Sequence, residues 1–512
     1  MCHIRRDNMA KTKEKIILSE IITAALIATA SLIICHSFQN QSIPSEITPR
    51  IISASDEKKD TSPTIDDALP TEETVRQKYV RIIRNTYLRK QKSYNAERIV
   101  LLKKNAECVL LEESDTFFKI TDANGQTGWI LQSHGELFDK EDIITHIPQK
   151  PSIVPYSMEG TKEGDDIGVI LKRNGTVGAG VAIIKDGQVA YHYEYGYANR
   201  EDKNNPVPVN ENTKFRIASV SKVVTSMLAM AEVDDGQLDL DAELSQLFGF
   251  GFCNPKYPNT PVTMRMLLTH TSGLSRKGVS YSISLNHVVK TKDYYTSKPG
   301  TSFNYSNLGM GIAGAAVEKA ANKFLSQYAR DRFFTPMGID ASYDGSLLND
   351  KSLVADCYDN GRHERSNDIL TRPVGRSASE PGKNYSLGQG NLLISAVDLA
   401  KVSTILLNDG MYENKRYLSH DAVSEMLTVH PVTTRTRYEQ CIGIRKFAGL
   451  VGEREMYYHT GTFYGILALM AIDPSDKSGV IVITSGAHPP RDDNTVFRVC
   501  NEVLSYCYSD IL

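Results

Sequence analysis

Features typical of metal-binding and nucleic-acid-binding proteins are scarce in this sequence. The eight cysteines are scattered, with no Cys-x-x-Cys pair and no histidine partners at zinc spacing. The net charge of -3 gives no basic surplus for a nucleic-acid partner. Cys500 and Cys507 are two turns apart on one predicted helix, so we expect buried thiols there rather than a disulfide. We therefore predict no metal site and no nucleic-acid partner.

The composition is otherwise globular, and 512 residues are enough for two or three domains. Residues 1–36 stand apart, because the apolar segment Ile16 to Cys35 follows a basic flank. This pattern predicts a membrane anchor with its N-terminus inside, a secretory signal cleaved near Ala28-Thr29-Ala30, or a lipoprotein signal at Cys35. A buried core helix is the remaining alternative. Every export interpretation places the rest of the chain outside the cytoplasm, secreted or anchored to the membrane.

Residues 37–76 are rich in Ser, Thr, Pro, Asp and Glu, so we expect a disordered linker. Residues 77–135 contain short alternating runs between turns and predict a small all-β barrel. Its ending, Asn124-Gly125-Gln126-Thr127-Gly128-Trp129-Ile130, resembles the bacterial SH3-like domain, which implies binding of cell-wall peptide and hence of peptidoglycan. Trp129 can equally be a packing residue. Residues 136–162 are predicted to be a second linker.

Residues 163–512 predict an α+β domain, in which an antiparallel sheet is flanked by helices and joined by a helical lobe. Asp186-Gly187 between strand-like runs predicts a β-hairpin. Two closing strands are expected at 457–472, broken by Gly461 and Gly465, and at 479–485. Helices are expected at 165–172, from 264 to a stop at Gly273, and at 309–323, 325–334, 396–407, 420–427 and 494–506. Strands at both ends with helices between them predict two lobes with a cleft at their junction.

Ser219 and Lys222 begin an apolar run, continuing to Ala231, that predicts a buried helix. Being three residues apart, their side chains share one helix face and are within reach of each other. A serine at the positive end of the helix dipole is favourably placed for a developing oxyanion. A desolvated lysine can lose its proton near neutral pH and activate the hydroxyl. Ser-x-x-Lys alone is common, and an exposed pair at a helix start is the alternative.

Two later segments suit the same chemistry. In Tyr305-Ser306-Asn307 the outer side chains can point to one side of an extended chain, and a tyrosine near Lys222 can pass a proton to a leaving group. His459-Thr460-Gly461-Thr462 lies on a predicted strand, where glycine permits close approach of a substrate backbone. Taken singly, Tyr305 suits a packed phenol and His459 a structural histidine.

Together and in this order, Ser219-x-x-Lys222, Tyr305-x-Asn307 and His459-Thr460-Gly461 resemble the serine hydrolases of the class C β-lactamase and DD-peptidase family. Further matches are Leu267-Leu268-Thr269-His270-Thr271-Ser272-Gly273-Leu274, Pro299-Gly300-Thr301, and Gly388-x-Gly390-Asn391-Leu392. The resemblance covers about two thirds of the chain, from Asp165 to Ser509, and implies the β-lactamase/transpeptidase-like fold.

The resemblance also implies roles. Ser219 is the nucleophile that forms an acyl-enzyme, Lys222 is the base or assists the base, and Tyr305 relays the proton to the leaving group. Asn307 steadies the substrate amide and Lys222. The strand residues His459, Thr460, Gly461 and Thr462 bind substrate, and the backbone N–H groups of Ser219 and Thr462 form the oxyanion hole. No cofactor is implied.

His459 stands where β-lactamases usually carry lysine, and histidine is charged only part of the time near neutral pH. The first hypothesis is therefore an extracytoplasmic serine hydrolase acting on a D-amino-acid peptide or a small amide or ester, as a DD-carboxypeptidase does. The second is β-lactamase or esterase activity on diffusible substrates. The third is a non-catalytic wall-binding or sensor protein, which the presence of Ser219, Lys222 and Tyr305 disfavours.

Overall fold

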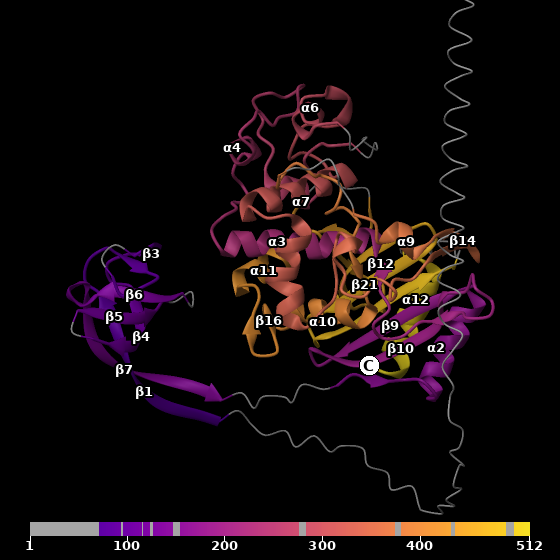
Figure 1. Ribbon diagram of the computed structural model, residues 1–512, viewed down its shortest axis with the longest axis horizontal. Helices are drawn as coiled ribbons and strands as arrows, with labels where there is room; N and C mark the ends of the chain where they lie inside the picture. The colour runs from indigo at the N-terminus through magenta and orange to yellow at the C-terminus, as the bar shows by residue number, and fades with distance from the viewer. Residues whose placement is uncertain are drawn as a thin grey trace, which may run out of the picture. The chain divides into compact units, whose positions relative to one another are not determined.

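The computed structural model describes residues 71–93, 96–114, 116–122, 126–146, 154–275, 283–373, 380–431, 436–487 and 496–512. The chain divides into two compact units, Met1–Pro148 and Gln149–Leu512 (Figure 1), and each is described by itself. Within these ranges, no helix combines the length and apolar character needed to cross a bilayer. The predicted anchor or signal at 16–35 lies outside the described residues.

The first unit is an antiparallel seven-stranded sheet in the order β3-β2-β6-β5-β4-β1-β7. Its strands are β1 (Thr71–Ile82), β2 (Thr86–Arg89), β3 (Arg98–Leu102), β4 (Glu107–Glu113), β5 (Phe117–Thr121), β6 (Thr127–Leu131) and β7 (Gly135–His146). Inward side chains such as Val80, Leu88 and Ile130 form a small core. The prediction of an all-β unit is confirmed, and its resemblance to SH3-like domains stays a prediction.

Two stretches predicted to be linker are strands. β1 begins at Thr71, inside the expected linker 37–76, and β7 runs to His146, inside the expected linker 136–162. The two strands pair antiparallel along their whole length, from Thr71↔His146 to Ile82↔Gly135. Each strand supplies the other's backbone hydrogen bonds. The β1–β7 pair therefore forms without the alternation of apolar and polar residues by which a strand is predicted from sequence.

The main sheet of the second unit has the order β11-β10-β9-β22-β21-β20-β19-β18, with β8 beside β10. Its strands are β8 (Tyr156–Ser157), β9 (Gly178–Lys185), β10 (Gln188–Asn199), β11 (Val207–Pro208), β18 (Glu439–Gln440), β19 (Arg445–Ala448), β20 (Glu455–Phe463), β21 (Ile466–Asp473) and β22 (Ser478–Ser485). The predicted hairpin is confirmed: Asp186 (φ 52) and Gly187 (φ 74) both take the left-handed conformation that a tight β9–β10 turn requires.

Helices cover both faces of this sheet. Along β9, Val181 and Ile183 join the core on one face, whereas Ala182 and Ile184 join the core on the other. The first core includes α2 (Lys162–Arg173) and α12 (Arg498–Asp510), and the second includes α3 (Ser221–Asp234) and α10 (Ala396–Leu407). Because both faces are covered, every residue of β21 and β22 is buried.

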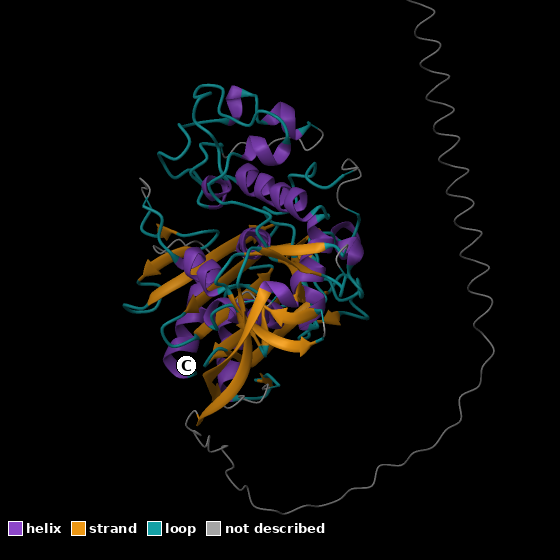
Figure 2. Cartoon of the chain, turned by 90° about the vertical axis from the view of Figure 1, so that its left-hand side faces the viewer, coloured by secondary structure: helices purple, strands orange, loops and turns teal. Residues whose placement is uncertain are grey.

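A helix-rich region lies at one end of the second unit (Figures 1 and 2). Its helices include α4 (Leu244–Phe248), α5 (Met264–Leu268), α6 (Leu285–Val288), α7 (Asn307–Ala321) and α8 (Leu325–Ala329). The remaining elements are β12 (Phe215–Arg216), β13 (Cys357–Asp359), β14 (Arg362–Arg365), α9 (Asn367–Leu370), β15 (Leu393–Ile394), β16 (Met411–Tyr412), β17 (Lys415–Arg416) and α11 (His420–Leu427). This is the α+β, two-lobed arrangement that the sequence predicts.

Some predicted boundaries need correction. The helix expected to run from Met264 to a stop at Gly273 ends at Leu268, because Thr269 bonds back to the carbonyl of Arg265 and His270 turns left-handed, at φ 60. The strand expected to break at Gly461 and Gly465 breaks only at Gly465. The helices at 396–407 and 420–427 and the buried free thiols of Cys500 and Cys507 are confirmed.

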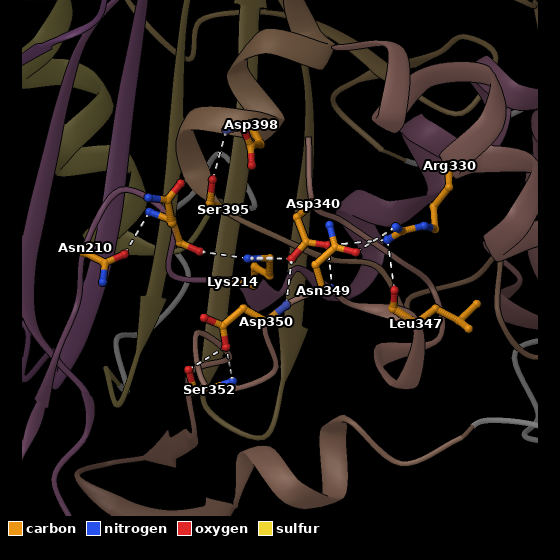
Figure 3. Close-up of polar contacts among 11 residues, drawn as sticks. Asn210, Lys214, Arg330, Asp340, Leu347, Asn349, Asp350, Ser352, Ser395 and Asp398 are labelled. Atoms are coloured by element: carbon orange, nitrogen blue, oxygen red, sulfur yellow. Dashed lines mark hydrogen bonds and ion pairs between the residues drawn. The ribbon is translucent and has the colours of Figure 1, made fainter. Parts of the chain in front are cut away.

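A polar cluster fixes the short strand that leads to Ser219 (Figure 3). The buried ammonium group of Lys214, directly before β12, lies 3.2 Å from the carboxylate of Asp340. Asp340 also accepts from the backbone N–H of Asn349 and from Arg330. On the other side, Phe215 pairs with Ile394 of β15. The segment entering the candidate site is therefore held on both sides.

Candidate active site

Ser219 lies in a 3-10 turn, Ala218–Val220, that leads directly into α3. The preceding Ala218 has φ +49, a left-handed conformation that costs an alanine about 1–3 kcal/mol. Such strain persists only where the surroundings impose it, and here it presents Ser219 at the start of a buried helix. The α-helix itself begins at Ser221, so Ser219 precedes the first turn in which it was expected.

Lys222 is fully buried on α3, and its Nζ donates hydrogen bonds to Ser219 Oγ (3.0 Å) and to the carbonyl of Gln389 (2.5 Å). Burial lowers the pKa of Lys222; the neighbouring Tyr305 opposes this, and the Arg445 cation adds to the lowering. A lysine in contact with the serine hydroxyl and with a reduced pKa is suited to accept the hydroxyl proton.

Tyr305, in the loop before α7, donates a hydrogen bond from its hydroxyl to Ser219 Oγ at 2.9 Å. Burial by itself would raise the pKa of Tyr305, but the cations of Lys222 and Arg445 outweigh it and lower the pKa. The structure thus brings Ser219, Lys222 and Tyr305 together, as the sequence predicts, although they come from segments far apart in the chain. The lowered pKa values of the lysine and the tyrosine allow a proton to pass between them through the serine.

His459, Thr460, Gly461 and Thr462 lie on β20, whose backbone packs against the turn that carries Ser219. A side chain at Gly461 would lie 2.3 Å from the carbonyl oxygen of Ile217 and 3.2 Å from the nitrogen of Ser219. Only glycine permits this approach. The strand and the turn that contain the predicted oxyanion-hole donors, the N–H groups of Ser219 and Thr462, are therefore in direct contact.

His459 is not a cation in this site. It is 2% exposed, and burial together with the charges of Arg445 and Lys222 lowers its pKa well below the usual value. Its Nδ1 lies 2.8 Å from the carbonyl of Thr460. Because a carbonyl only accepts, we assign the neutral imidazole with its proton on Nδ1. The expectation of a part-time charge is therefore corrected: His459 is neutral near pH 7.

Asn307 is exposed at the first position of α7, where the side chain of Ser306 caps the helix. In the part of the chain that the structure describes, Asn307 has no hydrogen-bond partner, and Lys222 bonds instead to Ser219 and Gln389. The expected contact from Asn307 to Lys222 is therefore not among the hydrogen bonds of Lys222 in the described residues. A contact from Asn307 to substrate stays a prediction.

Arg445 also belongs to the site, although no sequence pattern identified it as a site residue. It lies on β19, pairs with Tyr458 of β20, and is 8% exposed. Its guanidinium carbon lies 5.5 Å from the ring centroid of Tyr305 and 4.5 Å from that of Tyr438. Among the described residues it has no carboxylate partner, and its Nε makes no hydrogen bond. No motif marks this residue, because only the β19–β20 register brings it to Tyr305.

His270 also touches the site. Its carbonyl accepts from the N–H of Asn304 (2.7 Å), and its Nδ1 accepts from the N–H of Ser306 (3.3 Å). Its ring lies 4.5 Å from that of Tyr305, between centroids. One histidine thus holds the residues on both sides of Tyr305. The sequence offered a signal here, since His270 lies in a matched family motif, but no role was derived from it.

The fold and this serine–lysine–tyrosine arrangement define a serine hydrolase. Residues 162–503, two thirds of the chain, match the family model described as Beta-lactamase, and the chain belongs to that family. The family and fold predicted from the motifs are confirmed.

Curated relatives match parts of the chain. Protein flp of Staphylococcus aureus (strain MW2) is 28% identical over 175 residues, which cover 33% of this chain and 34% of that protein. Beta-lactamase-like protein 2 of Dictyostelium discoideum is 26% identical over 289 residues, covering 54% of this chain and 50% of that protein. The chain therefore spans half or less of the length of these relatives.

Solved structures share the fold. A class C beta-lactamase superimposes with a TM-score of 0.54 at 18% identity, covering 68% of this chain and 96% of that one. The D-amino acid amidase from Ochrobactrum anthropi SV3, complexed with L-phenylalanine, gives a TM-score of 0.53 at 22% identity, covering 68% and 97%. At these identities the likeness concerns the fold alone.

Proposed function

We propose that this protein is a DD-carboxypeptidase-like serine hydrolase, which releases a D-amino acid from a peptide that ends in a free carboxylate. The observation that carries the proposal is Arg445, a buried guanidinium beside Tyr305 without a carboxylate partner in the described part of the chain. Burying an unpaired cation is costly. A substrate carboxylate would pair with it.

The neutral state of His459 strengthens this argument. The strand position that usually supplies a lysine cation supplies none here, because burial lowers the pKa of His459. Lys222 is already bonded to Ser219 and Gln389. Arg445 is therefore the cation beside Tyr305 that is open to an anionic substrate group, and arginine binds carboxylates through two parallel hydrogen bonds.

The proposed reaction uses only this chain's own groups. Ser219 Oγ attacks the carbonyl carbon while neutral Lys222 takes the hydroxyl proton. The C–N bond of the resulting intermediate breaks as Tyr305 gives its proton to the leaving amine, and Lys222 restores the proton of Tyr305. Water then attacks the acyl-enzyme, returns a proton to Ser219 and releases the shortened peptide acid.

The test compares two substrates that differ in one charge. Full-length chain and Arg445→Gln are assayed on diacetyl-Lys-D-Ala-D-Ala and on its C-terminal amide. With each protein assayed at its own pH optimum, we expect Arg445→Gln to lower kcat/KM for the carboxylate peptide by roughly 100-fold, in line with a lost buried charge pair, and to change the amide little. Equal losses on both peptides would contradict carboxylate recognition, and no turnover of either would contradict the proposed function.

The alternative, an esterase or β-lactamase acting on diffusible substrates, is addressed by the same enzyme preparation. A neutral ester has no carboxylate for Arg445. Ester turnover that exceeds peptide turnover and is indifferent to Arg445→Gln would therefore favour the esterase.

We further propose that the enzyme works outside the cytoplasm, held by residues 16–35 at the membrane and by the first unit near peptidoglycan. The basic flank and apolar run of the N-terminus support this location. Digestion of whole cells by an added protease tests it: loss of the hydrolase unit is expected, and full protection until lysis would contradict it.

A further inference from the structure

Basic and acidic residues are segregated along the first unit. Between Lys78 and Lys104 the sequence has nine basic residues and one acidic residue, whereas residues 105–146 have two basic and nine acidic. The basic stretch contains β2, β3 and the loop that joins them. One part of this unit therefore carries a concentrated positive charge even though the whole chain is slightly acidic.

The strand register aligns part of this charge with the only tryptophan. Arg98 pairs with Arg89, Arg89 with Trp129, and Trp129 with Lys119, across β3, β2, β6 and β5. Directly paired residues share one face of a sheet. This is the outer face, because the neighbours Leu88, Ile120 and Ile130 point into the core. With strands about 4.8 Å apart, this cationic row spans roughly 14 Å.

Lys119, Lys92 and Arg98 lie beside aromatic rings, and Glu112, the register partner of Lys119 on β4, ends the row. Lys119 and Lys92 lie 5.8 and 5.4 Å from the Trp129 ring centroid, and the Arg98 guanidinium lies 4.3 Å from that of Tyr87. In the described residues, none of these cations has a carboxylate partner, and Arg89 donates to the carbonyl of Ala96. Trp129 is half-buried, so its ring remains partly accessible.

We propose that the cationic row of Arg98, Arg89, Trp129 and Lys119 binds an acidic glycan. An indole ring offers an apolar platform for a sugar ring, and the flanking arginines and lysines suit acidic groups that recur along a linear polymer. A single-stranded nucleic acid fits less well, because such strands are bound by rings that stack successive bases, and Trp129 is the one aromatic ring in this row. This binding function is separate from the proposed catalysis.

Trp129 is the only tryptophan, so its fluorescence reports on this surface in the full-length chain. Titration with polygalacturonate at low salt is expected to change the emission, whereas neutral dextran leaves it unchanged. Arg98→Glu combined with Lys119→Glu is expected to weaken binding at least tenfold, and added salt to weaken it in the unaltered chain. The control combines Lys103→Glu with Lys104→Glu, two residues that are not in the cationic row. It changes the charge by the same amount and is expected to weaken binding less than the Arg98→Glu, Lys119→Glu pair.

Four results would overturn the proposal: no titratable emission change, equal response to dextran, tighter binding of a twenty-residue oligothymidine or of polyglutamate, or equal weakening by the two paired variants. If the glutamate pair fails to fold, as judged by circular dichroism, Arg98→Gln with Lys119→Gln replaces it and is expected to weaken polygalacturonate binding in the same direction. Unchanged binding in that variant would also overturn the proposal.

Discussion

Two buried cations flank Tyr305, and they are held in different ways. Lys222 rises from α3 and is bonded to Ser219 Oγ and to the Gln389 carbonyl. Arg445 lies on β19 between tyrosine rings, with its Nε unbonded. A buried cation whose hydrogen bonds are made within the protein, as for Lys222, is suited to act on neighbouring protein groups. A buried cation with an unbonded N–H, as for Arg445, is suited to bind an anionic group of the substrate. On the proposed function, this contrast separates Lys222, which would activate Ser219, from Arg445, which would select the substrate.

The largest effect is expected from replacing Lys222, the hydrogen-bonded cation. Lys222→Met keeps the length of the buried side chain and removes its basic group, so we expect the acylation rate to fall roughly 1000-fold. Stopped-flow labelling with a fluorophosphonate measures it, with thermal unfolding as the control for folding. Because arginine stays protonated, Lys222→Arg should not restore the rate, and restoration would contradict a role as base.

The next effect tests the contact between β20 and the turn of Ser219. Gly461→Ala places a methyl group 2.3 Å from the Ile217 carbonyl. The strand must move, and a shift of about 1 Å can lower kcat roughly 100-fold. Gly251→Ala is the matched control, since a methyl group there meets no atom within 4 Å. Equal kcat for the two variants would show that this close approach is unimportant.

A smaller effect is expected from His270, which we interpret as a positioning residue for Tyr305. Removing its side chain in His270→Ala frees the N–H of Ser306 and the Tyr305 ring, and we expect kcat to fall roughly tenfold with KM little changed. His270→Asn tolerates the left-handed backbone and supplies an acceptor, so it should recover most of the activity. If both variants lose stability and activity in parallel, the role is structural only.

On the proposed function, Arg445 also affects Lys222 as the base. Its charge lowers the pKa of Lys222, and the base must be deprotonated to act. In Arg445→Gln that pKa rises, so the acidic limb of kcat/KM on the amide peptide is expected to move to higher pH. Lys446→Gln, the same change of charge on the neighbouring residue, is the control. A limb that stays in place would contradict coupling between the two cations.

The smallest effect is expected at His459. It is neutral, and Asn can donate to the Thr460 carbonyl as Nδ1 does, so His459→Asn should keep kcat/KM for the carboxylate peptide within about threefold. Since the pKa of His459 lies well below the usual value, the kcat/KM profiles of the unaltered chain and of His459→Asn should not differ by a limb near pH 6.5. A loss as large as that of Arg445→Gln would place carboxylate recognition on His459 instead.

Local patterns predicted most of the second unit. Asp186-Gly187 fixed a hairpin, apolar periodicity gave α10 and α11, and three spaced motifs identified Ser219, Lys222 and Tyr305. The contacts that depend on strand register or distant pairing were not predictable: Arg445 reaches Tyr305 through β19–β20, and β7 pairs with β1 from far along the chain. The neutral state of His459 also required the structure, because its burial and its neighbouring cations are set by the fold.

Intact mass after incubation with a fluorophosphonate tests the central claim, that Ser219 is a nucleophile activated by its neighbours. Full-length chain, Ser219→Ala and Ser221→Ala are treated side by side, the last removing a serine that bonds the N–H of Leu392 instead. One adduct per chain is expected in the unaltered protein and in Ser221→Ala, and none in Ser219→Ala. An adduct that persists in Ser219→Ala, or no adduct in a folded unaltered chain, would contradict the account.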